Sequence, residues 1–309
     1  MHTYKLPKAV LGNWLEDFPS TVGDYGHLLL EQVGSSDAEV VKALRPYFES
    51  AHLDAREHFH EEICIDLHPD ADAPGSHATY PTCLPRKTRR GLFGEVLSGM
   101  LTEHYPFVGG HNWQVPIFLF RHHEDVRNYL FALARDSGLT REVLGRHGSD
   151  FLAVAFDADG SIKRYLAGEA KWRKTLGKGV VNALLKGQKG KGGIWYQLNE
   201  RDKNIPHGMR QLQRLLKARD PVEYEKAILS IDEALLVKDP KPIPRTNLIL
   251  IAGIDYSSRA SGTSIISQKV KPVDYLSEHD LQVVELFLAD DGEDLIDAIY
   301  DSLWKEPEV

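Results

Sequence analysis

Two carboxylates and a lysine lie at the ends of a predicted β-hairpin, where they could act together on a phosphate group. Two largely apolar runs flank Asp159-Gly160, a dipeptide typical of tight hairpin turns. If the turn contains only these two residues, Asp150 lies directly opposite Glu169, with Cβ atoms about 5 Å apart. Lys171 comes two residues after Glu169, so it lies on the same face of the sheet.

This combination of residues predicts a metal site for phosphodiester hydrolysis. Two carboxylates held opposite each other repel, and a divalent cation between them removes the repulsion. Mg²⁺ prefers oxygen ligands, so the predicted ligands are Asp150, Glu169 and the carbonyl of Ala170, with Mn²⁺ as a substitute. The metal would lower the pKa of an attacking water, and Lys171 would orient that water or hold the phosphate.

The prediction depends on the length of the turn. A four-residue turn over 157–160 leaves Asp150 diagonal to Glu169 on the same face, whereas a three-residue turn places them on opposite faces. The alternative without chemistry is a hairpin whose ends carry surface charges. Both strands are apolar on both faces, which is typical of buried strands and favours the site.

A basic stretch follows the hairpin. Between Ala170 and Asn199 there is no Asp or Glu. The positive charges in this stretch are Lys171, Arg173, Lys174, Lys178, Lys186, Lys189 and Lys191. A second basic run occupies 86–90. We expect Arg173, Lys174 and Lys178 to contact nucleic-acid phosphates. The alternative is a solvated lysine-rich face, the commoner fate of a charge run.

The spacing of Asp150 and Glu169-Ala170-Lys171 resembles the PD-(D/E)xK nuclease motif. More narrowly, residues 94–97, 148–150 and 168–172 resemble the HamA family, the nuclease subunits of Hachiman antiphage systems, over about residues 89–187. The resemblance implies an α/β restriction-endonuclease-like core, a mixed central sheet flanked by helices, with N- and C-terminal elaborations. It also implies an acidic active-site residue on the preceding helix. Glu95 is the candidate, as a ligand or through water, although Glu103 lies on the same helix.

The resemblance implies a Mg²⁺-dependent deoxyribonuclease in bacterial antiphage defence, controlled by a HamB-like superfamily-two helicase in a heterodimer. One alternative is a non-catalytic nucleic-acid-binding or scaffold subunit with a nuclease-like fold. The intact set of Asp150, Glu169 and Lys171 argues against it. The other is a solitary restriction-type endonuclease, which would need a sequence-reading domain of which the sequence gives no sign.

Periodicity and composition predict the organisation of the chain: an N-terminal elaboration (1–85), a nuclease core (86–255) and a C-terminal helical extension (256–309). Helices are predicted at 36–52, 89–105, 124–136, 175–186, 208–219, 222–235 and 293–304, and strands at 63–67, 115–120 and 247–253. We expect an irregular opening and a short helix over 1–34, a mobile basic loop at 187–193 and a linker at 238–244. The N-terminal segment and the apolar residues of the last helix (Leu295, Ile296, Ile299, Tyr300 and Trp304) are candidates for partner docking, although packing on the chain's own core is at least as common.

The composition predicts an intracellular globular protein. The net charge of −8 argues against a molecule coated in basic surface. Two cysteines, Cys64 and Cys83, make a disulfide framework improbable. Without an apolar leader or a run of membrane-spanning length, we expect a cytoplasmic location and no membrane contact. The histidines near residues 58–62 and 122–123 lack the spacing of a zinc site.

Overall fold

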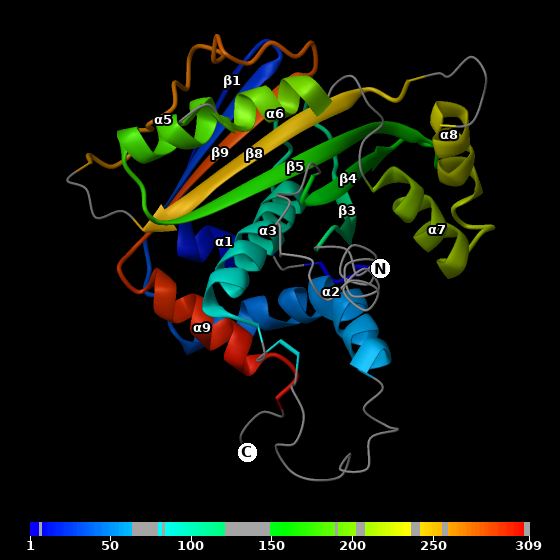
Figure 1. The fold of residues 1–309 in the computed structure, drawn as a ribbon, viewed down its shortest axis with the longest axis horizontal. Helices are drawn as coiled ribbons and strands as arrows, with labels where there is room; N and C mark the ends of the chain where they lie inside the picture. The colour runs from blue at the N-terminus through cyan, green and yellow to red at the C-terminus, as the bar shows by residue number, and fades with distance from the viewer. Residues whose placement is uncertain are drawn as a thin grey trace, which may run out of the picture.

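The computed structural model describes residues 1–5, 8–63, 80–81, 84–120, 149–188, 191–201, 208–235, 242–254 and 259–305. These residues form a mixed α/β fold around a seven-stranded sheet in the order β1-β2-β9-β8-β5-β4-β3 (Figure 1). Its strands are β1 (Leu15–Val22), β2 (Tyr25–Gln32), β3 (Gln114–Phe118), β4 (Phe151–Phe156), β5 (Ile162–Thr175), β8 (Arg245–Ile254) and β9 (Asp280–Leu288). The described helices are α1 (Lys8–Trp14), α2 (Ala38–Ile63), α3 (Arg86–His104), α5 (Lys178–Lys186), α6 (Ile194–Arg201), α7 (Met209–Arg219), α8 (Glu225–Leu235) and α9 (Gly292–Ser302).

The centre of the sheet is parallel and its two margins are antiparallel. The four central strands, β2, β9, β8 and β5, run parallel to one another. At one margin β1 pairs antiparallel with β2. At the other margin β4 pairs antiparallel with both β5 and β3. β8 is buried at every position, as a strand covered on both faces must be. The predicted mixed sheet flanked by helices is therefore present.

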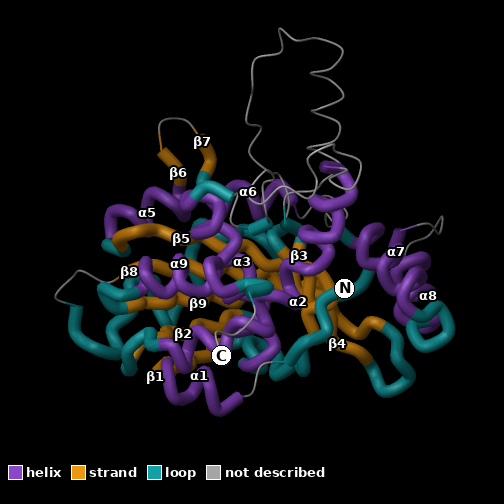
Figure 2. The backbone as a smooth tube through the Cα atoms, turned by 90° about the horizontal axis from the view of Figure 1, so that it is seen from below, coloured by secondary structure: helices purple, strands orange, loops and turns teal. Residues whose placement is uncertain are grey.

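Helices cover both faces of this sheet. The first face packs against α1, α2, α3 and α9, and α2, α3 and α9 lie in front of the strands in Figure 2. On the second face, α5 and α6 pack over β2, β8 and β9, whereas α7 and α8 pack over β3, β4 and β5. Side chains from β5 alternate between the faces: Ala170 and Trp172 belong to the first, and Tyr165 and Ala167 to the second.

Several predictions about the ends of the chain are wrong. The segment 1–34 contains α1, β1 and β2, and it was predicted to be irregular with a short helix. β9 lies inside the predicted C-terminal helical extension. Because β1, β2 and β9 share one sheet with the hairpin strands, the division at 85/86 and 255/256 does not follow the sheet.

The predicted loop at 187–193 contains a short antiparallel ladder of β6 (Gly187–Gln188) and β7 (Lys191–Gly192).

For most predicted helices, the first and last residues lie within three positions of those observed. α3, α5, α7, α8 and α9 match the predicted spans, and α2 extends further than expected, to Ile63. The strand at 63–67, apart from its first residue, and the helix at 124–136 lie outside the described residues, as do Cys64, Cys83 and most of the predicted linker. No helix in the described ranges is long and apolar enough to span a bilayer.

The hairpin has the predicted register, but a three-residue turn and a β-bulge produce it instead of a two-residue turn. Its turn has three residues: Gly160, at φ 85°, donates to Asp157 O (3.0 Å), and Asp157 donates to Ser161 O (2.9 Å). Such a turn alone would put the two hairpin ends out of phase. A β-bulge at Lys163, opposite which β4 has no residue, restores the phase. Phe151 then pairs with Gly168, so the predicted two-residue turn is wrong but the predicted register beyond the bulge is confirmed.

The arginines of the basic run at 86–90 form ion pairs within the fold. They lie on α3 and pair with acidic residues of α9: Arg86 with Asp297 (2.9 Å), Arg89 with Asp301 (3.0 Å) and Arg90 with Glu293. The apolar residues of α9, including Leu295, Ile296, Ile299 and Tyr300, are buried in the first-face core. These four residues therefore pack on the chain's own core, the alternative left open by the sequence, and are not available as interface anchors.

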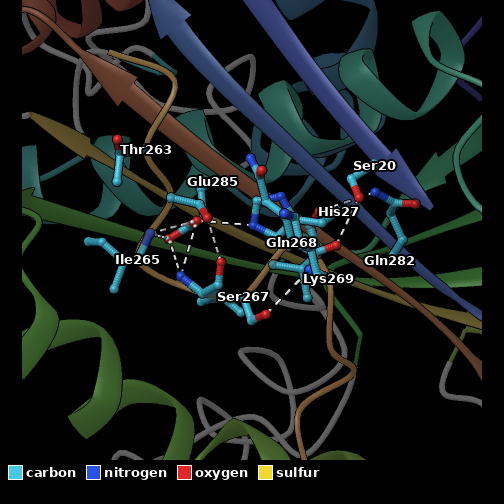
Figure 3. A network of polar contacts seen from close by, with 12 residues as sticks. Ser20, His27, Thr263, Ile265, Ser267, Gln268, Lys269, Gln282 and Glu285 are labelled. Carbon is cyan, nitrogen blue, oxygen red and sulfur yellow. Dashed lines mark hydrogen bonds and ion pairs between the residues drawn. The ribbon is translucent and has the colours of Figure 1, made fainter. Parts of the chain in front are cut away.

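The segment from Arg259 to Tyr275 is fastened to the second face by two buried carboxylates. Glu285 of β9 accepts hydrogen bonds from the amides of Ile265 and Ile266 and pairs with His27 of β2 at 3.0 Å (Figure 3). Glu31 of β2 accepts from the amide of Gly262 and pairs with Arg259. These acidic residues have structural partners, so their burial does not mark them as a reactive centre.

Candidate active site at the open end of the hairpin

The site lies where β5 extends beyond the end of its ladder with β4. In the described part of the chain the β4–β5 ladder ends at the pair Phe151–Gly168, whereas β5 continues to Thr175 along β8. Gly168 is required at this point, because a Cβ atom there would approach a ring carbon of Phe151 to 2.1 Å. Beyond Gly168 no strand among the described residues pairs with the edge of β5 that faced β4.

Asp150 forms hydrogen bonds with β5 at the position where the β4–β5 ladder ends. Its amide donates to Gly168 O (2.7 Å), and its Oδ2 accepts a hydrogen bond from the amide of Ala170 (2.7 Å). The residue is 6% exposed. Strand alternation places it on the second face with Leu152 and Val154. Two backbone-anchored hydrogen bonds thus fix the carboxylate beside Glu169.

Glu169 and Lys171 lie on the same second face. Their parallel partners in β8 are Ile249 and Ile251, which belong to the α5–α6 core. The Glu169 side chain is 5% exposed and that of Lys171 is 29% exposed. The Lys171 ammonium forms an ion pair with Glu169 Oε1 and donates to the carbonyl of Ala170 at 3.3 Å.

Three carboxylates determine the charge state of Lys171. Burial alone would lower the pKa of the ammonium, but the charges of Glu169, Asp150 and Glu95 outweigh this effect and raise its pKa above the ordinary value. Lys171 is therefore cationic at neutral pH. The four predicted active-site residues belong to one electrostatic cluster.

Glu95 reaches this cluster from the opposite face. It is half-buried on α3, directly after Gly94, where an added Cβ would lie 3.7 Å from Trp172 Cβ and 3.9 Å from Ala170 Cβ. The helix therefore packs closely on β5 at this point, and the charge of Glu95 acts on Lys171 where β4 has ended. Glu103, by contrast, accepts hydrogen bonds from Tyr47 Oη (2.7 Å) and the amide of Val115 (2.9 Å). Of the two glutamates, Glu95 is the one whose charge acts on Lys171.

The residues predicted to bind phosphate lie at the junction of β5 and α5. Arg173, Lys174 and Lys178 are exposed there, and Arg173 Nη1 donates to the carbonyl of Trp172 at 2.8 Å. Lys186 further along pairs with Asp274 at 3.0 Å. The placement of Lys189 and of the Lys191 side chain lies outside the described residues. Trp172 and Trp195 are buried in the core.

The donor set suits a hard cation. Within the described ranges no three His, Cys, Asp or Glu side chains form a group that could hold a metal ion. The predicted set does not need three, since it combines two carboxylates with a backbone carbonyl, and Mg²⁺ takes its remaining ligands from water and substrate. Glu169 Oε1 and Ala170 O already converge on one cationic nitrogen, that of Lys171. These two oxygens can therefore face a single cation.

Sequence reasoning missed Lys163, whose bulge sets the phase of the hairpin. The three-residue turn had a signal, because Gly160 is typical of the left-handed residue that ends such a loop, but the separate bulge at Lys163 had none.

Comparison with known proteins adds no name to this site. No protein-family model matches the chain, and no curated protein is significantly similar to it.

Proposed function

We propose that this chain is a Mg²⁺-dependent deoxyribonuclease that hydrolyses phosphodiester bonds, acting in antiphage defence under the control of a HamB-like helicase. The observation that carries the proposal is the cluster of Asp150, Glu169 and Lys171 at an open strand edge, with Glu95 contributing charge from α3. The helix that carries Glu95, α3, also precedes the hairpin, as the resemblance to PD-(D/E)xK nucleases implies.

Each residue has a separate part in the proposed reaction. Asp150, Glu169 and the carbonyl of Ala170 would hold Mg²⁺, which when bound supplies Lewis acidity and lowers the pKa of a bound water. Lys171, held cationic by its neighbours, would contact a phosphate oxygen or orient the water. Glu95 would position Lys171 or a bound water from the α3 side. Lys174 and Lys178 would neutralise phosphates beyond the cleaved bond.

One observation favours a second candidate, a non-catalytic nucleic-acid-binding subunit. Two carboxylates and a lysine can form a structural ion-pair cluster, and within the described residues no group of three acidic, histidine or cysteine side chains could hold a metal ion. In that case the exposed lysines would bind DNA without cleavage.

Metal dependence separates the two candidates. The purified protein, alone and mixed with a HamB-like helicase, should cleave DNA with Mg²⁺ or Mn²⁺ and lose all cleavage when a chelator is added. Ca²⁺ should bind without supporting comparable turnover, because its looser coordination positions the water poorly. Cleavage that persists in chelator would contradict the metal mechanism. DNA binding without cleavage under all these conditions would favour the non-catalytic subunit.

The two exposed lysines should contribute to DNA binding through charge. Lys174→Ala and Lys178→Ala should each weaken binding and reduce the slope of log affinity against log salt concentration by about 0.9, because each removes one phosphate contact. Lys186→Ala is the matched control, since that lysine is already paired with Asp274. The readout is a DNA-binding isotherm at several salt concentrations in Ca²⁺. An unchanged slope in both variants would show that DNA follows another path.

A further inference from the structure

The ammonium of Lys171 donates hydrogen bonds to two oxygen atoms of the proposed metal site. It contacts Glu169 Oε1 and, at 3.3 Å, the carbonyl oxygen of Ala170. Both belong to the donor set that would face Mg²⁺. An ammonium and a metal ion cannot bind the same carboxylate and carbonyl oxygens from the same side, so their occupancies are mutually exclusive.

We propose that Lys171 is an exchangeable internal cation: its ammonium fills the metal position in the metal-free protein and has to leave before Mg²⁺ binds. This inference rests on the proposed function. It makes Lys171 a brake on metal binding as well as a participant in the reaction. The side chain released by the metal then becomes available to the phosphate.

Burial explains why a cation at this position stabilises the metal-free protein. The Glu169 side chain is 5% exposed, and a carboxylate buried to this degree is costly unless it is paired. Asp150, 6% exposed, and the half-buried Glu95 add further negative charge nearby. The ammonium compensates part of this charge when no metal is bound.

The side chain also has room to leave. Lys171 is 29% exposed, in contrast to Glu169, and a lysine is a point charge on a flexible four-carbon stem. Among the described residues, no strand pairs with this edge of β5 beyond Gly168. The ammonium can therefore move towards solvent or substrate without a change in the backbone.

The test is the affinity of the DNA-free protein for Mn²⁺, measured by calorimetry and by electron paramagnetic resonance. Lys171→Met keeps the length of the side chain and removes the competing charge, so it should bind Mn²⁺ at least about tenfold more tightly than the wild type. Lys171→Arg, which keeps a cation at the position, should not gain affinity. Lys174→Met removes the same charge from an exposed site three residues away, and solvent screening should limit its effect to about twofold.

The outcomes distinguish this inference from the nuclease proposal. If Lys171→Met gains no more affinity than Lys174→Met while wild-type binding is lost in Glu169→Gln, the metal site stands and the exchange is refuted. If neither the wild type nor Lys171→Met binds Mn²⁺, both the exchange and the metal-dependent nuclease are refuted. Should Lys171→Met fail to fold, Lys171→Gln replaces it, with the same tenfold gain expected and the same result against it.

Discussion

Asp150→Asn is expected to reduce Mg²⁺-dependent DNA cleavage by at least about 100-fold while leaving the fold intact. The amide oxygen of asparagine can still accept the hydrogen bond from Ala170, so the end of the hairpin keeps its anchor. The charge that would attract the metal is lost. Single-turnover cleavage of labelled DNA measures the effect, and thermal unfolding checks the fold.

Glu169→Gln should cause a loss of similar size for the same reason. Glu16→Gln is the control, because Glu16 is an exposed glutamate on β1, at the far margin of the sheet. If the two active-site variants, folded and able to bind DNA, cleave as fast as the wild type, the assignment of the site is wrong.

His52 should make the protein less stable in acid. Its ring is fully buried, stacked on Phe120, with nitrogen atoms 2.6 Å from Tyr80 Oη and 3.1 Å from Tyr300 Oη. Burial lowers its pKa from 6.5 to about 3. Between these two values the unfolded chain binds a proton that the folded protein does not, so stability rises with pH in this window and is lost as the pH falls.

The expected loss attributable to His52 between about pH 7.5 and pH 4.5 is about 2–3 kcal/mol of unfolding free energy. Urea unfolding of the wild type and of His52→Asn at several pH values measures it. The variant should be less stable at neutral pH, because it loses packing against Phe120, but its stability should fall less steeply with acidification. Equal slopes in the two proteins would contradict a neutral buried imidazole.

The hairpin and its helices were predictable because their signals are local. The apolar faces of α3, α7 and α8 repeat with helical periodicity within each segment, and the register of β4 and β5 follows from two apolar runs around one turn. The turn itself was mistaken, because a dipeptide alone does not fix loop length. The bulge at Lys163 offsets the extra turn residue. The predicted register next to Asp150 was therefore right, although the predicted turn was wrong.

Long-range pairings carried no comparable signal. β1 is exposed along most of its length and contains Pro19, so it lacks the alternation that marks a half-buried strand. β2 pairs with β9, a strand about 250 residues away, and short apolar runs do not reveal such partners. The ion pairs of the α3 arginines had no local signal either, because their acidic partners lie some 200 residues later on α9.

The position of β9 also determines when the sheet can close during synthesis. β2 and β8 are both translated before β9, the strand that separates them. Until β9 has left the ribosome, both carry an unpaired edge and the N-terminal hairpin of β1 and β2 has no place in the sheet. The β8–β5 pair that supports Glu169 and Lys171 therefore gains its outer neighbour late, as one of the last strands of the described chain to be made. A nascent chain stalled before this point has no complete sheet on which to hold the site.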